Sequence, residues 1–377
     1  MAIDHIEARW VSIPVDRPTR MSTRSLDRRD YLLVEIESDG AVGVGYAYAG
    51  TRGGSLLAAA VRDVLAEVLI GASDTDTAGL WERMYQESLL VGRRGAMVRA
   101  ISAVDIALWD LQGVKLGVPL AVLLGGSVRP IPAYASGGYY RPDDGSWTEA
   151  IGTEIEFNRS LGFEDHKIKV GGLSVAEDAD RVAAATEAIA GRGRLALDAN
   201  NAYRTVTEAL AAARAFEAAA GPAGLWWFEE PLSPDEIAGH AQLARELETP
   251  VATGEIHQTR WDFRDLISTG AADVLQPDVG VIGGVTEWIR VAHAASMFGL
   301  PVAPHWHANV HAHLAAVTPN CEVIEHFAME KDIYNFERLL TPESRLAVGD
   351  GNVLLTDRPG IGITLDRNVV EKFTVSS

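Results

Sequence analysis

The pattern of hydrophobic and polar positions divides the chain into two parts, and the first part mixes strands with helices. Residues 31–49 alternate apolar and polar positions on both sides of Asp39-Gly40, a pair that is typical of hairpin turns. Three helical patterns follow, beginning near Ser55, Ala78 and Met97. The first part therefore predicts an α+β domain with one antiparallel hairpin.

From about residue 131 onward, strand-like and helical segments alternate strictly. The eight strand-like segments are IPAYAS (131–136), HKIKV (166–170), LALDAN (195–200), LWWFEEP (225–231), PVATGE (250–255), DVLQPD (273–278), PVAPH (301–305) and EVIEH (322–326). Seven helical segments separate them, at roughly the ~30-residue spacing of a βαβ unit, which predicts a barrel of parallel strands. A doubly wound open sheet fits less well, because eight units are long for it and no glycine-rich fingerprint follows the first strand.

These patterns predict three parts of the chain. Residues 1–128 form an α+β domain, residues 129–345 form a modified TIM barrel of the type (β/α)7β, and residues 346–377 form a tail. The tail is strand-like with turns, and we expect it to pack back on the first domain and complete it.

Composition and charge narrow the classes of partner. The net charge is -19, from 52 acidic and 33 basic residues, which argues against nucleic acid and anionic membranes as partners. The single cysteine, Cys321, excludes an internal disulfide and fits a reducing compartment. Since no apolar run is long enough to span a bilayer and no signal segment is evident, we expect a cytoplasmic protein.

Titratable residues lie at the ends of the predicted strands. In barrels of this type the chemistry lies at the carboxyl ends of the strands, so polar residues there are candidates for function. Seven consecutive strands, from the second to the eighth, end in such residues: Lys167 and Lys169, Asp198, Glu229, Glu255, Asp278, His305 and Glu325. This pattern predicts a reactive site at one rim of the barrel.

Three of these residues form a candidate metal site. Asp198, Glu229 and Glu255 end adjacent strands, so their carboxylates should converge and raise one another's pKa unless a cation lies between them. An all-oxygen set favours Mg²⁺, with Mn²⁺ as a second possibility, over Zn²⁺. The alternative is a ring of salt bridges to arginines on loops, but no arginine occupies a comparable position in the sequence.

Two further groups are candidate bases. Lys169 lies nearer the mouth of the barrel, and its like-charged neighbour Lys167 is expected to lower the pKa of Lys169 toward neutrality. The alternative is that both ammonium groups extend to solvent. His305 can be oriented by Asp278 on the preceding strand, which fixes its tautomer. The later histidines, His311 and His313, are expected to be structural.

This arrangement fits one class of reaction. A metal ion acidifies the hydrogen α to a bound carboxylate by stabilising the enediolate that forms when a base removes it. Lys or His bases beside Mg²⁺ are the arrangement of enolase-superfamily sites.

On these residues the chain resembles the enolase superfamily and, within it, the mandelate racemase subgroup. The segment SAVDIALWDLQGVKLGVPLAVLLGG (102–126) is similar to the stretch that joins the capping domain of the family to its barrel. The motifs KIK, DANNAY, WFEEPL, TGE, LQPD and the PH before HLAAVTPN follow in family order over nearly the whole chain.

The resemblance implies a role for each matching position. It implies Asp198, Glu229 and Glu255 as Mg²⁺ ligands, Lys169 as one base tuned by Lys167, and His305 with Asp278 as the opposite base. Glu325 would hydrogen-bond the substrate carboxylate or enediolate. Asn200, Ser136 and, in a mobile loop of the capping domain, Arg24 would lie near the substrate.

The resemblance leaves several reactions open. Most members of the family with both bases resemble acid-sugar dehydratases, so the resemblance implies dehydration of a sugar acid to a 2-keto-3-deoxy acid. The polar loops around Arg24 also suit a hydroxylated carboxylate. Racemisation or epimerisation, and cycloisomerisation of a sugar lactone or anhydro sugar, are the alternatives. A more distant alternative is a non-catalytic or phosphate-binding barrel that uses VGVIGG (279–284), although this segment lacks the Lys-Ser/Thr of a phosphate loop. The family also suggests a homo-oligomer, an octamer or a dimer.

Overall fold

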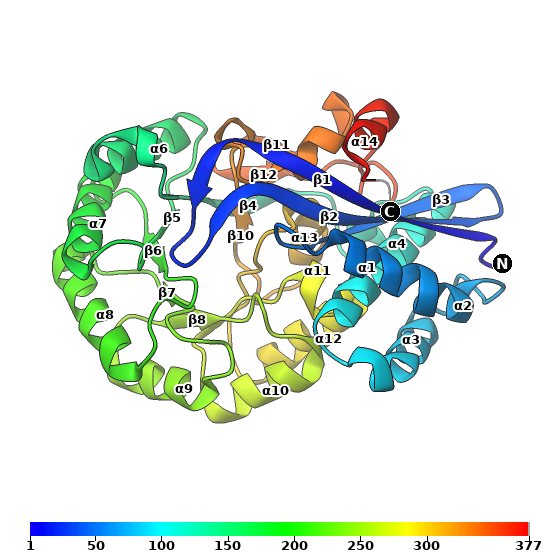
Figure 1. The fold of residues 1–377 in the computed structure, drawn as a ribbon, viewed down its shortest axis with the longest axis horizontal. Coiled ribbons are helices and arrows are strands. Elements are labelled where there is room, and N and C mark those ends of the chain that lie inside the picture. Colours follow the sequence, from blue (N-terminus) through cyan, green and yellow to red (C-terminus); the bar gives the residue numbers. More distant parts are fainter. Residues whose placement is uncertain (376–377) are drawn as a thin grey trace.

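The structure, a computed structural model, describes residues 1–375, in which an antiparallel sheet with its helices lies beside a barrel of parallel strands (Figure 1). The predicted fold class, a modified TIM barrel with an α+β capping domain, is confirmed. Within these residues no helix combines the length and the apolar character needed to cross a membrane.

The antiparallel sheet contains β1 (His5–Arg20), β2 (Ser25–Ser38) and β3 (Ala41–Tyr48) in this order. The predicted hairpin is confirmed, since β2 and β3 pair directly across Asp39 and Gly40, whose φ angles of 53° and 73° are the left-handed values that a tight hairpin turn requires. The sequence analysis did not identify β1. Two prolines interrupt its pattern, and its pairing with β2 shifts register between Pro14 and Thr19.

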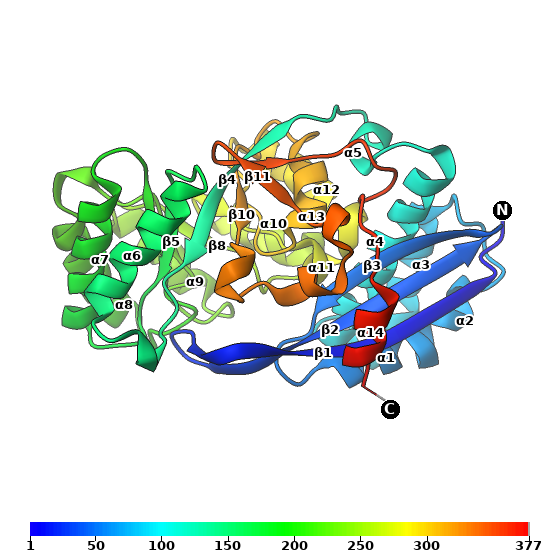
Figure 2. The same cartoon turned by 90° about the horizontal axis from the view of Figure 1, so that it is seen from above.

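The loop between β1 and β2 reaches across the mouth of the barrel (Figures 1 and 2). In this loop the hydroxyl of Ser22 donates to the carbonyl oxygen of Val170, and that of Thr23 donates to the carbonyl oxygen of Asn200 at 3.2 Å. The capping sheet is therefore tied to the carboxyl ends of the second and third barrel strands.

Five helices accompany this sheet: α1 (Gly54–Ala60), α2 (Ala66–Leu69), which continues α1 through a π-helical turn, α3 (Thr77–Gly92), α4 (Ala96–Leu116) and α5 (Leu120–Leu123). Helix α4 is buried on two faces. It packs so closely on β3 that a β-carbon at Gly45 would lie 2.0 Å from the carbonyl oxygen of Ala103. Toward the barrel, the carboxylate of Asp105 accepts hydrogen bonds from the amide and the hydroxyl of Thr286, at 2.9 and 2.7 Å.

The barrel strands are β4 (Pro130–Gly137), β5 (His166–Lys169), β6 (Leu195–Asp198), β7 (Phe228–Glu229), β8 (Val251–Thr253), β9 (Val274–Leu275) and β10 (Ile324–His326). Each pairs in parallel with the next from β4 to β9, and β10 pairs in parallel with β4, so the last barrel strand lies beside the first. The predicted seventh strand, residues 301–305, is reduced to a single parallel bridge between Leu275 and Val302. Pro301 and Pro304 lack the amide donors that a longer ladder would need.

The helices that surround the barrel are α6 (Trp147–Ser160), α7 (Val175–Ile189), α8 (Val206–Ala220), α9 (Ile237–Glu246), α10 (Thr259–Thr269), α11 (Val279–Ile282), α12 (Gly284–Met297) and α13 (Ala308–Ala315). The glycine-rich segment 279–284 forms the short helix α11 and the start of α12. Its Gly284, with φ of 87°, lies against α4, where a β-carbon would be 2.4 Å from Asp105 Oδ2. Close packing between the two domains thus accounts for this glycine.

The tail forms β11 (Ala347–Gly349), β12 (Asn352–Leu354) and α14 (Arg367–Phe373). Strand β12 pairs antiparallel with β4 of the barrel, whereas α14 lies along β1 and Arg367 forms an ion pair of 2.6 Å with Glu35 (Figure 2). The tail therefore contacts both the barrel and the capping sheet, and the domain bounds at residues 128 and 345 stay a prediction. Residues 376 and 377 of the predicted tail lie outside the described residues.

The close approach of β3 and α4 gives a test of the fold. Gly45→Ala should lower the free energy of unfolding by about 1–3 kcal/mol, because the added methyl group overlaps backbone atoms of α4. Calorimetry should show a lower thermal midpoint. Gly152→Ala is the matched control, since nothing lies within 4 Å of that position on α6, and it should leave the midpoint equal or higher. An unchanged midpoint for Gly45→Ala would contradict the packing.

Candidate active site

A cavity of about 350 Å³ lies between the capping sheet and the rim of the barrel. Arg24, Arg29 and Tyr48 line it from the capping domain, and Lys169 and His305 line it from the barrel. Because parallel strands present their carboxyl ends at one rim, residues far apart in sequence meet in this cavity.

The three predicted metal ligands converge at the rim of the barrel, where Glu255 lines the cavity. Asp198 and Glu229 occupy paired positions on β6 and β7, and Glu255 follows β8. One carboxylate oxygen from each of the three lies within 4.8 Å of the others. Burial raises the pKa of Glu229 to about 8, although Lys167 opposes the shift. Three converging oxygen donors, two of them fully buried, fit a hard divalent cation.

Glu230, which the sequence analysis did not single out, belongs to the same acidic cluster. It is 1% exposed, has a positive φ of 42°, and neither of its carboxylate oxygens has a hydrogen-bond partner in residues 1–375. Burial and the nearby Glu255 raise the pKa of Glu230 well above its ordinary value. A buried carboxyl group without a hydrogen-bond partner is costly, and a cation bound at the neighbouring triad would reduce this cost.

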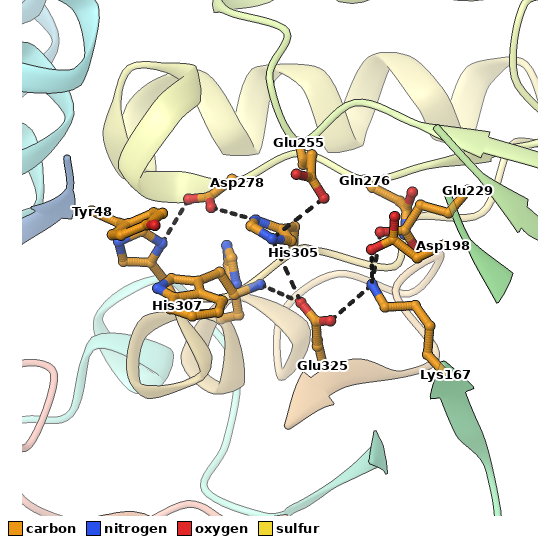
Figure 3. A network of polar contacts seen from close by, with 12 residues as sticks. Tyr48, Lys167, Asp198, Glu229, Glu255, Gln276, Asp278, His305, His307 and Glu325 are labelled. Atoms are coloured by element: carbon orange, nitrogen blue, oxygen red, sulfur yellow. Dashed lines mark hydrogen bonds and ion pairs between the residues drawn. The ribbon is translucent and has the colours of Figure 1, made fainter. Parts of the chain in front are cut away.

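Lys167 joins three acidic groups at the base of the site. Its Nζ lies 2.7 Å from Glu229, 2.8 Å from Glu325 and 3.8 Å from Asp198, and its side chain is fully buried (Figure 3). Burial alone lowers the pKa of Lys167, but Glu229 and Glu325 raise it well above the ordinary value. Lys167 is therefore an ammonium held by carboxylates, and neither lysine extends to solvent.

The expected effect of Lys167 on Lys169 is outweighed in the structure. Burial and Lys167 both lower the pKa of Lys169, but the ion pair between Lys169 and Asp198 is stronger, so the net shift is upward. The prediction of a near-neutral Lys169 is thus wrong for the protein without a cation. The sequence could not show that Asp198 Oδ2 lies directly beside the amine, because that contact depends on the register of β5 and β6.

His305 lies among three carboxylates. Its Nδ1 donates to Asp278 Oδ2 at 2.8 Å, and its Nε2 lies 3.3 Å from Glu255 and 4.0 Å from Glu325 (Figure 3). Although burial lowers the pKa of His305, Glu255 and Asp278 raise it to about 9. A second imidazole, that of His307, lies 2.7 Å from the other oxygen of Asp278, and the sequence analysis did not identify this contact.

Other polar residues hold the site in place. Gln276 donates to Glu229 at 2.6 Å, and the indole of Trp227 donates to the same oxygen at 3.0 Å. The amide of Trp306, a residue with φ of 69°, donates to Glu325 at 2.8 Å. Gln276 directly follows β9, and its position two residues before Asp278 in the predicted strand was a usable sequence signal.

The predicted substrate residues divide into two groups. Arg24 and Asn200 line the cavity, and the backbone N–H of Asn200 donates to Asp198 Oδ1 at 2.9 Å. Ser136 on β4 is 5% exposed, is not part of the cavity wall, and its hydroxyl has no partner in the part of the chain that the structure describes. The roles of all three stay predictions.

Together, a barrel with a capping sheet over its mouth and an acidic cluster at the strand ends define a capped barrel suited to a divalent cation. Family models match both parts: residues 5–125 match the mandelate racemase / muconate lactonizing enzyme N-terminal domain, and residues 153–369 match the enolase C-terminal domain-like family. The chain belongs to the mandelate racemase/muconate lactonizing enzyme family of the enolase superfamily. The resemblance seen in the sequence is confirmed.

Relatives with several activities are similar to the chain. Arabinonate dehydratase from Saccharolobus solfataricus is 34% identical over 354 residues, which cover 92% of this chain and 91% of that protein. D-galactarolactone cycloisomerase from Agrobacterium fabrum is 34% identical over 387 residues, 99% of each chain. A racemase from Streptomyces coelicolor, solved with bound magnesium, superposes with a TM-score of 0.90 at 32% identity and covers 99% of this chain and 100% of its own.

The contact between Asp278 and His305 predicts a measurable titration. His305, with a pKa of about 9 against an ordinary value of about 6.5, is an imidazolium at neutral pH in the metal-free protein. Its contribution to stability is fully present below about pH 6.5 and is lost as the pH rises through about 9. Asp278→Asn should lower the pKa of His305, which NMR of the ring nitrogens measures directly.

The NMR signal of His305 is assigned as the one that is missing from the spectrum of His305→Asn. Asp265→Asn is the control, since that side chain is 41% exposed and lies on α10, and it should leave the titration unchanged. A pKa of His305 that is the same in Asp278→Asn and in the unchanged protein would contradict the assignment.

Proposed function

We propose that the protein is an enzyme that removes the proton α to the carboxylate of a sugar acid and then eliminates water to give a 2-keto-3-deoxy acid. The observation that carries the proposal is that two basic side chains, Lys169 and His305, line one cavity and each contacts a different carboxylate of the same acidic triad. The activities of the relatives support this class of reaction.

Asp198, Glu229 and Glu255 are the proposed ligands of Mg²⁺, with Mn²⁺ as a substitute. A divalent cation bound there holds the substrate carboxylate and offsets the negative charge that develops on it after proton loss. Glu325, whose pKa Lys167 lowers to about 2 in spite of burial, stays ionised unless it gains a proton from the substrate region. We assign it to hydrogen bonding with the substrate carboxylate or enediolate, a role in which Glu325 must carry a proton, because an ionised carboxylate cannot donate to another anion.

The residues of the chain supply the proton transfers. In spite of burial, Asp198 and Glu255 raise the pKa of Lys169 and His305, and a cation bound by these carboxylates would offset that effect, so that one of the two side chains can be unprotonated. This base takes the α-proton, and the electron pair of the C–H bond moves into the carboxylate to give the enediolate. The conjugate acid of the second base then protonates the β-hydroxyl, the C–O bond breaks, and water leaves. The enol that remains becomes the 2-keto-3-deoxy acid by gaining a proton at carbon 3.

A second candidate uses the same residues. Delivery of a proton to the opposite face of the enediolate, with no leaving group, gives racemisation or epimerisation. If the β-oxygen belongs to a lactone or anhydro ring, its C–O bond to the β-carbon breaks in place of the loss of water, and the ring opens in a cycloisomerisation. The cycloisomerase and racemase among the relatives support this alternative. The phosphate-binding alternative loses support, because Gly284 of the segment 279–284 packs against Asp105 of α4, and this packing accounts for the glycine without a bound phosphate.

The setting of the enzyme is also a proposal. We place it in the cytoplasm as a homo-oligomer, a dimer or an octamer. Its one cysteine, Cys321, is a buried free thiol, and burial raises the pKa of this thiol to about 12, which fits a reducing compartment.

Replacement of the two bases tests the proposal. Lys169→Ala and His305→Ala should each lower turnover of sugar acids by at least about 100-fold, because each removes a group that moves a proton. Ultraviolet or NMR detection of the 2-keto-3-deoxy product, and exchange of the α-hydrogen in deuterated water, are the measurements. His293→Ala on the outer surface of α12 is the control and should keep full activity. Full activity in both Lys169→Ala and His305→Ala would exclude the assignment.

The metal ligands have a separate test. Glu255→Gln should weaken Mg²⁺ binding by at least about tenfold, because an amide oxygen replaces a charged one. Isothermal calorimetry measures the affinity without any substrate, and Glu246→Gln on α9 is the control. Equal affinity in Glu255→Gln and the unchanged protein would show that Glu255 is not a ligand.

A further inference from the structure

The capping side of the cavity carries positive charge, and no acidic residue of the capping domain lines it. Three arginines, Arg24, Arg29 and Arg99, line the cavity from this side, and the other lining residues there are apolar, hydroxylated or glycine. The acidic members of the wall, Glu255 and Asp278, come from the barrel. A chain with a net charge of -19 thus concentrates cations at one end of its cavity.

Arg29 is the most deeply buried of these arginines. It is 1% exposed, and its guanidinium lies 4.4 Å from the ring of Trp306 and 5.1 Å from that of Tyr48. One nitrogen, Nη1, donates to the hydroxyl of Tyr48 at 2.8 Å. Nε and Nη2 have no hydrogen-bond partner within residues 1–375. A buried guanidinium without a carboxylate is costly unless a ligand completes it.

Arg181, the other arginine that is 1% exposed, shows how this chain neutralises a purely structural guanidinium. It pairs with Asp178 at 2.8 Å and donates to the carbonyl oxygens of Lys169 and Gly138, at 2.7 and 2.6 Å. Arg29 has no comparable set of acceptors. The difference indicates that the missing partner of Arg29 is an anion that enters the cavity.

The position of Arg29 defines which part of a substrate it can meet. Trp306, on which it stacks, follows the proposed base His305 and stacks with that imidazole, the ring centres being 5.7 Å apart. Arg29 and His305 thus both lie against the indole of Trp306, Arg29 coming from the capping sheet and His305 from the barrel. A substrate whose reacting carboxylate lies at the acidic triad would extend its other end toward Arg29.

We propose that Arg29 binds a second carboxylate of the substrate, so that the substrates are hydroxylated dicarboxylic acids rather than monocarboxylic sugar acids. This inference rests on the proposed function for the position of the first carboxylate. The planar guanidinium can offer Nε and Nη2 together to both oxygens of a carboxylate. A monocarboxylic sugar acid ends in a hydroxymethyl group, which leaves the buried charge of Arg29 without a counterion.

The test compares matched acids in the Mg²⁺-loaded enzyme. A panel of five- and six-carbon sugar diacids, including galactarate and glucarate, is assayed against the corresponding monoacids, including galactonate and gluconate. The unchanged enzyme should have the higher kcat/KM for a diacid. In Arg29→Gln the ratio of kcat/KM for that diacid to kcat/KM for its monoacid should fall by about 100-fold, as expected for loss of one partner of a buried charged pair.

Arg28→Gln is the matched control. Arg28 is the preceding residue on β2, its side chain is 48% exposed, and it lies 3.8 Å from Asp27, so its replacement should leave the ratio unchanged. Circular dichroism checks the folding of each variant. If Arg29→Gln does not fold, the same ratio is measured in Arg29→Lys and in the unchanged enzyme. A preference of the unchanged enzyme for monoacids is by itself enough to overturn the inference.

The outcomes separate this inference from the proposed function. Turnover of monoacids without preference for diacids, or an equal loss for both in Arg29→Gln, overturns the role of Arg29 while the proposed function stands. If no acid of the panel turns over, the proposed function fails, and calorimetry with the same acids tests Arg29 alone. Diacid binding that Arg29→Gln removes and Arg28→Gln keeps supports the inference, and absence of diacid binding overturns it.

Discussion

The site depends on one ammonium group that keeps several buried carboxylates together. Lys167 is fully buried and lies within 4 Å of Asp198, Glu229 and Glu325, which come from three different strands. Without it, these like charges would repel in a region from which water is excluded, and removing one partner of such a buried group typically costs about 3–5 kcal/mol. The barrel therefore places a buried positive charge beside the converging acids, and this charge offsets their repulsion.

The capping domain completes the site by closing it from the other side. Its helix α4 is packed between β3 and α12, with Asp105 bonded to Thr286 of α12 and buried deeply enough that burial raises the pKa of Asp105 to about 7. The loop between β1 and β2 is held to the barrel through Ser22 and Thr23. With both attachments in place, the cavity has an acidic wall from the barrel and an arginine-bearing wall from the cap, so a bound molecule meets two kinds of chemistry at its two ends.

This division of labour explains how one family can contain dehydratases, cycloisomerases and racemases. Proton removal beside a carboxylate needs only the acids and bases of the barrel rim, which the strands position. The outcome after proton removal depends on what the rest of the substrate carries, and the residues that meet that part come from the cap. In the proposed chemistry Lys169 and His305 transfer protons, whereas Arg29 is proposed to bind the far end of the substrate.

The sequence by itself determined the barrel and the position of its reactive rim. Strand and helix periods are local properties, and a titratable residue at the end of each strand, from Lys169 to Glu325, is visible without coordinates. Only the tertiary structure decided the partners of these groups: that Asp198 lies beside Lys169 and raises its pKa, that Asp278 contacts both His305 and His307, and that Glu230 is an orphaned acid. It also showed that Arg29, on a strand of the other domain, faces this cavity. Such contacts depend on strand register and on docking between residues hundreds of positions apart, and charge effects at a few ångströms are too sensitive to that geometry to be inferred from order along the chain.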